Sequence, residues 1–210
     1  DWTNPWGEYK YVDSIELRED GGTPGFLQCI RTALCIDLKN KMNTELIRKR
    51  EEELLEICFA EMSKIKGLHI LAENVKKRIG IVSFYFDDIH YNLVVKLLND
   101  RFGVQVRGGC ACAGTYGHFL LDVTHEQSRK ITKLINKGDL SLKPGWVRLS
   151  LHPTMTNEEL LFTIDALHQI SENYKDWAKD YVYSKKTNEF THHAQAEDYY
   201  DNIVKKWLVL

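Results

Sequence analysis

The chain has 210 residues, a formal net charge of −2 and 43% hydrophobic residues. This composition provides enough apolar material for a folded core, and the nearly neutral charge disfavours nucleic-acid binding, which usually requires a basic excess. No apolar run approaches the roughly 20 residues of a bilayer-spanning helix, so we expect no membrane segment. The five cysteines are odd in number and irregularly spaced, which argues against a disulfide framework and favours a reducing compartment, the cytoplasm.

The first part of the chain indicates an arm followed by two long helices. Residues 1–20 are rich in aromatic and turn-forming residues and are expected to pack on something else. Thr23 and the proline after it are typical of a helix start, so we expect Thr23 to cap a helix over 24–42. A second apolar stripe predicts a helix over 45–66, which Gly67 ends.

The rest of the chain mixes strands and helices. Hydrophobic spacing predicts strands at 68–71, 80–86, 104–106 and 146–151, and helices at 89–102, 124–136 and 157–177. Asp87-Asp88 is expected to cap the first of these helices, and Thr156 with Glu159 forms a capping box for the last. The sequence therefore predicts an α+β fold with an arm and long helix at 1–42, a small domain at 43–177 and a helical tail at 178–210.

The segment Arg107-Gly-Gly-Cys-Ala-Cys112 has a composition that suits a binding or catalytic loop. An arginine after a strand can hold a carboxylate in its planar fork, and glycines let a ligand approach the backbone. A loop thiol, here Cys110 or Cys112, can act as a nucleophile. The structural alternative is a small-residue turn with Arg107 in a surface ion pair.

Two other positions have similar alternatives. Arg148 lies in a predicted strand among apolar neighbours, which fits either a structural ion pair or a contact with substrate or cofactor. The turn containing Gly22 and Thr23 offers backbone amides and a hydroxyl at a helix N-terminus, which fits either an anion site or a simple helix start.

A metal site is the weaker interpretation of the cysteines. Cys110, Cys112 and His118 are one ligand short of a closed zinc site, so we expect no metal. His192 and His193 lie in a polar tail and are expected to be solvated.

Three segments together resemble the class V aminotransferase-like enzymes, pyridoxal-phosphate enzymes that include cysteine desulfurases and selenocysteine lyases. The matching segments, in the family's order, are 18–25, 106–113 and 147–159. The resemblance covers about residues 15–175. It implies the C-terminal small domain of a fold-type I pyridoxal-phosphate enzyme, with a mixed or antiparallel sheet, a homodimer and an amino-acid substrate.

The resemblance also implies roles for individual residues. The turn of Gly22 and Thr23 would reach the cofactor phosphate across the dimer interface. Arg107 would bind the substrate α-carboxylate, and Arg148 would help to hold the carboxylate or the loop.

In one desulfurase subgroup the persulfide-forming cysteine lies five residues after that arginine, which corresponds to Cys112, with Cys110 as the alternative. The family's lysine that binds the cofactor covalently precedes the Gly-Thr-Pro turn, and Lys10 lacks its context. We therefore expect a C-terminal segment of a longer enzyme, inactive alone. The alternatives are a stand-alone binding module and a dimerisation module built on residues 24–66.

Overall fold

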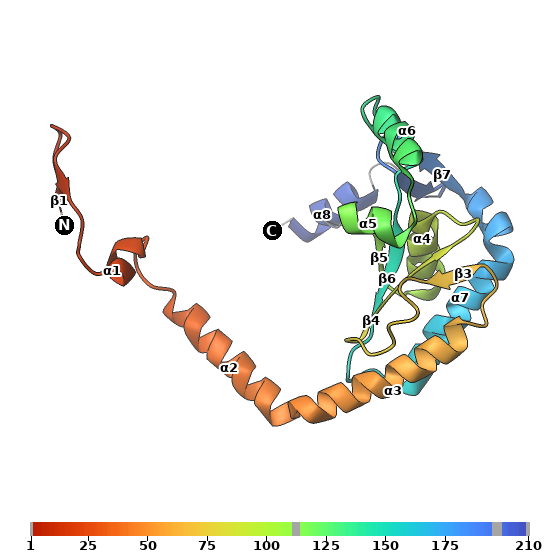
Figure 1. The fold of residues 1–210 in the computed structure, drawn as a ribbon, viewed down its shortest axis with the longest axis horizontal. Helices are drawn as coiled ribbons and strands as arrows, with labels where there is room; N and C mark the ends of the chain where they lie inside the picture. Colours follow the sequence, from red (N-terminus) through yellow and green to blue (C-terminus); the bar gives the residue numbers. More distant parts are fainter. Residues whose placement is uncertain (1, 111–113, 195–198, 209–210) are drawn as a thin grey trace. The chain divides into compact units, whose positions relative to one another are not determined.

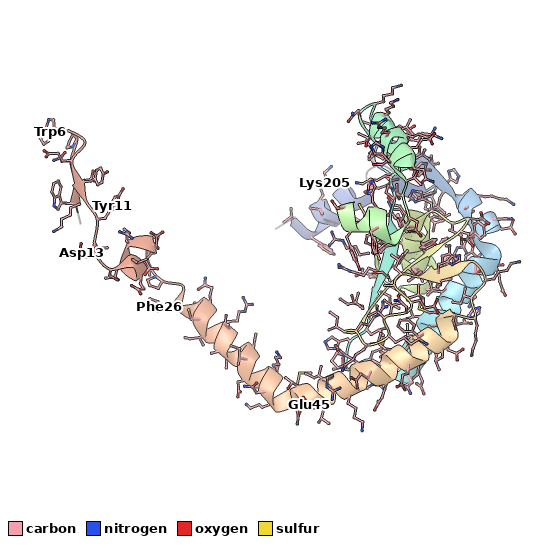
Figure 2. All side chains as sticks on the ribbon, viewed as in Figure 1. Trp6, Tyr11, Asp13, Phe26, Glu45 and Lys205 are labelled. Atoms are coloured by element: carbon pink, nitrogen blue, oxygen red, sulfur yellow. The ribbon has the colours of Figure 1, made fainter. Side chains whose placement is uncertain are left out.

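The computed structural model describes residues 2–110, 114–194 and 199–208, and the chain divides into two units, Asp1–Ile47 and Arg48–Leu210 (Figure 1). The elements of the first unit are β1 (Trp2–Thr3), β2 (Tyr9–Lys10), α1 (Ile15–Glu19) and α2 (Phe26–Met42). No residue of α2 is buried, and Trp6, Tyr11 and Phe26 are largely exposed (Figure 2). This unit has no core of its own among the described residues.

The start of α2 differs from the expected one. Gly25, not Thr23, occupies the N-cap position, and no side chain caps the helix. The physical reason is that a glycine follows the proline and adopts a non-helical ψ of 68°, which delays the first helical residue to Phe26.

The second unit is built on a four-stranded antiparallel sheet in the order β3-β4-β6-β5. Its strands are β3 (Leu68–Ile70), β4 (Ile81–Phe86), β6 (Trp146–Ser150) and β5 (Arg107–Gly109). Three predicted strands are confirmed, but the one expected at 104–106 is wrong. The Val104 amide instead bonds to the carbonyl of Leu98 and closes the preceding helix, so pairing with β6 begins only at Arg107.

The helices of this unit match most of the predictions. They are α3 (Thr44–Met62), which begins in the first unit, α4 (Tyr91–Phe102), α5 (Gly114–Leu120), α6 (His125–Ile135) and α7 (Asn157–Trp177). The capping box of Thr156 and Glu159 is confirmed, with nitrogen-to-oxygen distances of 2.8 and 3.1 Å. The expected cap of α4 is wrong: His90 caps it, because the Asp87 amide bonds to the carbonyl of Gly67 and stays with the strands.

The C-terminal segment is only partly helical. A short 3-10 turn (Ala178–Asp180) leads into a hairpin of β7 (Tyr181–Ser184) and β8 (Glu189–His192), and α8 (Tyr199–Leu208) follows. The expectation of a helical tail fails here because the turn residue Asn188 has a φ of 61°, which reverses the chain between alternating aromatic residues.

The core lies on one face of the sheet. Along β4, Val82, Phe84 and Phe86 are buried, whereas the residues between them are partly exposed. The helices contribute buried residues to the same cluster: Leu54, Leu55, Cys58, Phe59 and Met62 from α3; Leu93, Val94, Leu97 and Leu98 from α4; Leu160, Ile164, Leu167 and Ile170 from α7. The opposite face carries more exposed side chains, among them Ser83 of β4 and Arg148 of β6.

Helices α3 and α7 run side by side in the same direction (Figure 1). Arg50 of α3 donates to the Met155 carbonyl just before α7, and Ser171 of α7 donates to the Lys66 carbonyl just after α3. Within the described ranges, no helix is long and apolar enough to cross a membrane.

Candidate functional site

Two arginines face each other on the sheet. Arg107 of β5 is the register partner of Arg148 of β6, and Arg148 is in turn the partner of Ser83 on β4. Directly opposed residues of an antiparallel pair project to the same face, about 5 Å apart at their Cβ atoms. Val147 and Leu149 beside Arg148 are buried in the core, so the arginines lie on the other face. Two like charges placed in this way destabilise the pair of strands unless an anion joins them.

Neither guanidinium has a partner in the part of the chain that the structure describes. No ion pair among the described residues includes Arg107 or Arg148. The structural ion pairs that the sequence offered as alternatives are therefore not found there. The Nε atom of Arg148 is buried and makes no hydrogen bond to a described residue. A buried donor without an acceptor costs about 1–3 kcal/mol. The arrangement therefore fits an external carboxylate, which can accept from both forks.

The glycines of β5 serve packing. A Cβ at Gly108 would lie 2.6 Å from Oδ1 of Asn92 on α4, so only glycine lets β5 lie this close to the helix. Gly109 has a φ of 110°, which strongly favours glycine. The sequence suggested that these glycines let a ligand approach the backbone. At Gly108 the space is instead taken up by α4.

Of the two cysteines of the motif, only Cys110 lies among the described residues. Cys110 follows β5 and is partly buried, next to Gly117 of α5, which also packs on Trp146. Cys112 lies outside the described residues. The structure thus places Cys110 at the end of the strand that carries Arg107 and says nothing of Cys112.

His118 is already engaged. Its Nδ1 lies 2.8 Å from the Gly114 carbonyl and its Nε2 lies 2.9 Å from Oγ of Ser128. A carbonyl only accepts, so Nδ1 donates the proton and Nε2 accepts from the serine hydroxyl. No cluster of three or more metal-ligating side chains occurs among the described residues. His118 therefore ties α5 to α6.

Gly22 and Thr23 belong to the first unit, whereas Arg107 and Arg148 belong to the second. Both are exposed, and Gly22 has a φ of 145°. The Phe26 amide bonds to the Pro24 carbonyl, and no side chain caps α2. The Leu27 and Gln28 amides that follow are left for another acceptor, which fits a phosphate group.

The structure also shows a polar cluster that sequence reasoning missed. His90, Tyr91 and Asn92 at the start of α4 meet Asn188 from the β7–β8 turn, and all four are wholly or partly buried. No local motif marks these residues, because they are almost 100 positions apart. The only available signal was a His-Tyr-Asn run just before a strong apolar helix.

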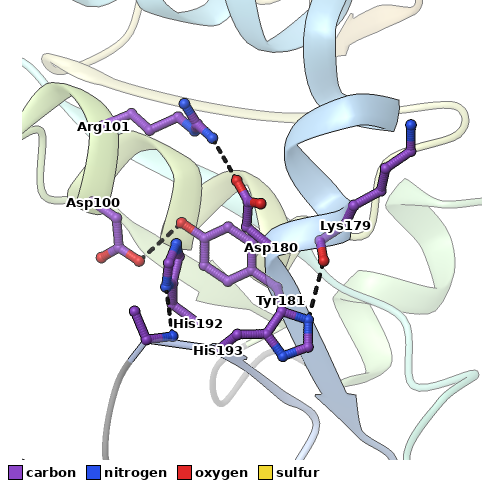
Figure 3. A network of polar contacts seen from close by, with 8 residues as sticks. Asp100, Arg101, Lys179, Asp180, Tyr181, His192 and His193 are labelled. Carbon is purple, nitrogen blue, oxygen red and sulfur yellow. Dashed lines mark hydrogen bonds and ion pairs between the residues drawn. The ribbon is translucent and has the colours of Figure 1, made fainter.

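In the histidine pair of the tail, His193 is exposed as expected, whereas His192 is partly buried. The His192 ring packs edge-on against Tyr181 with a centroid distance of 5.0 Å. Nε2 of His193 lies 3.1 Å from the carbonyl oxygen of Lys179 (Figure 3). Both rings therefore help to hold the hairpin.

The position of His90 makes stability dependent on pH. Its Nδ1 accepts from the Asn92 amide at 3.1 Å, and its ring stacks on Tyr91. Burial lowers the pKa of His90, and the nearby Asn188 side chain offsets part of that effect. The unfolded chain therefore takes up a proton near pH 6.5 that the folded chain resists, and stability falls as pH drops below that value.

We predict that His90→Asn reduces the loss of stability at low pH, because asparagine keeps the helix cap but does not titrate. Urea denaturation at pH 7 and pH 5 measures it. An unchanged pH slope in the variant would show that other groups cause the effect.

The second unit is a small α+β domain with two facing arginines, and comparisons with known proteins identify its family. A family model described as aminotransferase class-V matches residues 5–162. Probable cysteine desulfurases from Staphylococcus aureus and Halalkalibacterium halodurans are 33% and 32% identical to the chain over 99 and 94 residues. These matches cover 47% and 45% of this chain and 24% and 22% of the relatives.

Solved structures share the fold. A cysteine desulfurase from Thermococcus onnurineus superposes with a TM-score of 0.58 at 23% identity, covering 82% of this chain and 37% of that one. One from Escherichia coli gives 0.51 at 16% identity, covering 72% and 32%. The chain belongs to the class V aminotransferase family of pyridoxal-phosphate-dependent enzymes. It spans about a quarter of the length of the curated relatives that it matches.

Proposed function

We propose that the chain carries the substrate-carboxylate site of a cysteine desulfurase-like enzyme, or of its selenocysteine lyase relatives. The observation that carries this proposal is the facing pair Arg107 and Arg148, which has no ion-pair partner among the described residues. The two guanidiniums bind the α-carboxylate of the amino acid and fix its orientation. That orientation determines which bond at the Cα atom is broken.

The cofactor and the thiol complete the proposed chemistry. When bound, pyridoxal phosphate withdraws electrons from the Cα atom of the amino acid. In this chain Gly22, Thr23 and the uncapped start of α2 would hold its phosphate. The thiolate of Cys112, or of Cys110 as the alternative, attacks the substrate sulfur. A sulfur–sulfur bond forms, the carbon–sulfur bond breaks, and the electron pair stays with the carbon fragment, which takes up a proton.

The proposed assembly is a homodimer in the cytoplasm, in which residues 1–42 join a small domain at 43–177. The exposed apolar residues of α2 support an interface there: Phe26, Leu27, Ile30, Leu34, Ile36, Leu38 and Met42. Cys29, Cys35 and Cys58 form no disulfide, which suits a reducing compartment.

A titration of the 210-residue chain tests the carboxylate site. We expect L-alanine to shift the NMR signal of the Arg148 Nε–H group, and L-alaninamide, which lacks the carboxylate, to leave it in place. Replacing Arg107 with glutamine should weaken L-alanine binding about tenfold or more, because it removes charge-assisted hydrogen bonds.

The exposed Arg129 of α6 provides the matched control. Arg129→Gln should bind L-alanine as the unmodified chain does. Equal binding of L-alaninamide, or an equal loss in the Arg129 variant, would favour a binding module of another kind. Peptide mapping of the intact enzyme after exposure to L-cysteine would then show whether Cys112 or Cys110 gains a sulfur atom.

A further inference from the structure

The β7–β8 hairpin lies beyond the residues that the family model matches, and it is anchored to α4 at both ends. Figure 3 shows the anchor near the end of α4. The Tyr181 hydroxyl lies 3.0 Å from the Asp100 carboxylate, and Arg101 pairs with Asp180 at 2.8 Å. Burial, followed by the bond to Asp100, raises the pKa of Tyr181, so its hydroxyl stays protonated and donates.

The second anchor is Asn188, in the turn of the hairpin. Asn188 is 6% exposed, and its side-chain nitrogen donates to the Tyr91 hydroxyl at 2.6 Å. Its side-chain oxygen accepts from the Tyr183 hydroxyl at 2.7 Å, and its backbone carbonyl accepts from the Asn92 side chain. Asn188 therefore fixes two consecutive residues at the start of α4.

Those two residues support the strand that carries Arg107. Oδ1 of Asn92 lies 2.6 Å from where a Cβ on Gly108 would be. A Cβ on Gly145 would lie 2.6 Å from the Tyr91 ring and 3.0 Å from the Cα of Gly109. Tyr91, Gly145 and β5 are therefore closely packed. A shift of either side chain would therefore let β5 move.

Strand β5 has little rigidity of its own. It has three residues and two glycines, and β6 is its only partner among the described strands. Glycine gives the backbone the most freedom, and an edge strand has a ladder on one side only. The contacts with α4, those of Tyr91 and Asn92 among them, therefore help to set where Arg107 lies relative to Arg148.

We propose that Asn188 is a positioning residue for the carboxylate-binding pair, acting through Tyr91 and Asn92 on β5. This inference rests on the proposed function for the role of the pair. Its structural part, the placement of β5, can be measured without any ligand.

The test compares Asn188→Gly with Tyr181→Phe in the 210-residue chain. Glycine tolerates the φ of 61° and removes only the side-chain bonds, so the turn is retained. Tyr181→Phe removes the bond to Asp100 and loosens the other end of the hairpin. Three quantities are measured: the thermal midpoint, amide hydrogen exchange at Gly108 and Gly109, and the affinity for L-alanine.

We expect Asn188→Gly to speed exchange at both glycines and to weaken L-alanine binding about tenfold, since small displacements of binding groups have large effects. Tyr181→Phe should lower the thermal midpoint but change the affinity less than about twofold, because its effect is confined to the far anchor. If Asn188→Gly does not fold, Tyr91→Phe replaces it, because this variant keeps the ring and loses the bond to Asn188.

Three results would decide against the proposal or separate it from the proposed function. Unchanged exchange and affinity in Asn188→Gly would overturn it and leave the carboxylate site standing. Equal losses of affinity in both variants would overturn it too, since they would reflect hairpin stability alone. If the unmodified chain does not bind L-alanine, the proposed function fails, and faster exchange in Asn188→Gly still supports the placement of β5.

Discussion

Replacing Arg148 with methionine is expected to stabilise the protein while it removes carboxylate binding. Arg148 faces Arg107 across the strands, and its buried Nε atom lacks an acceptor among the described residues. Methionine has a similar length and no polar hydrogen, so it relieves both the repulsion and the unmet hydrogen bond. We expect the free energy of unfolding to rise by about 1–2 kcal/mol. Affinity for L-alanine should fall more than about tenfold, since the site loses one of the two guanidinium groups that bind the carboxylate.

Urea denaturation and the L-alanine titration measure the two effects on the same samples. Arg101→Met is the matched control, because Arg101 is paired with Asp180 at 2.8 Å and lies over the Trp177 ring at 4.4 Å. This variant should lose stability and keep the affinity. If Arg148→Met loses stability as Arg101→Met does, the guanidinium of Arg148 has a structural partner and the carboxylate site is wrong.

Replacing Phe84 with alanine is expected to cause the largest loss of stability. Phe84 is fully buried, and its ring meets that of Phe86 edge-on with a centroid distance of 6.1 Å. It lies on the central strand β4, between Ile70 of β3 and Val147 of β6. The variant loses the burial of the ring and leaves a cavity, which together lower the free energy of unfolding by about 3–5 kcal/mol.

The same denaturation experiment measures this loss, and Ser83→Ala is the control on the neighbouring residue. Ser83 points to the opposite face, so its replacement should change the free energy of unfolding by less than about 0.5 kcal/mol. A loss below about 1 kcal/mol in Phe84→Ala would mean that the core does not close around this ring.

Local patterns in the sequence predict most of the elements of the second unit. The capping box of Thr156 predicts the start of α7 because its two hydrogen bonds join residues three positions apart. The alternation of Val82, Phe84 and Phe86 predicts the buried face of β4 for a similar reason, since it depends only on the period of a strand. The family follows instead from the resemblance of three short segments, 18–25, 106–113 and 147–159, to known enzymes.

The details of the site depend on contacts between distant residues, which local patterns do not contain. Arg107 and Arg148 are both visible in the sequence, but their pairing depends on the register of β5 against β6. A shift of one residue would send Arg107 to the other face. The role of Asn188 is hidden for the same reason, because its partner Tyr91 is 97 positions away. The reactivity of Cys112 stays a prediction.

Because side chains alternate between the two faces of the sheet, the surroundings of the arginine pair can be changed separately from the core. On β4 and β6 the residues that hold the core and those beside the arginines come in turn along the same strands. A mutant library confined to Ser83, Tyr85 and Ser150 would therefore vary the surroundings of the arginine pair and leave every core position unchanged. Such a library can explore side chains of other substrates with little loss of folded protein.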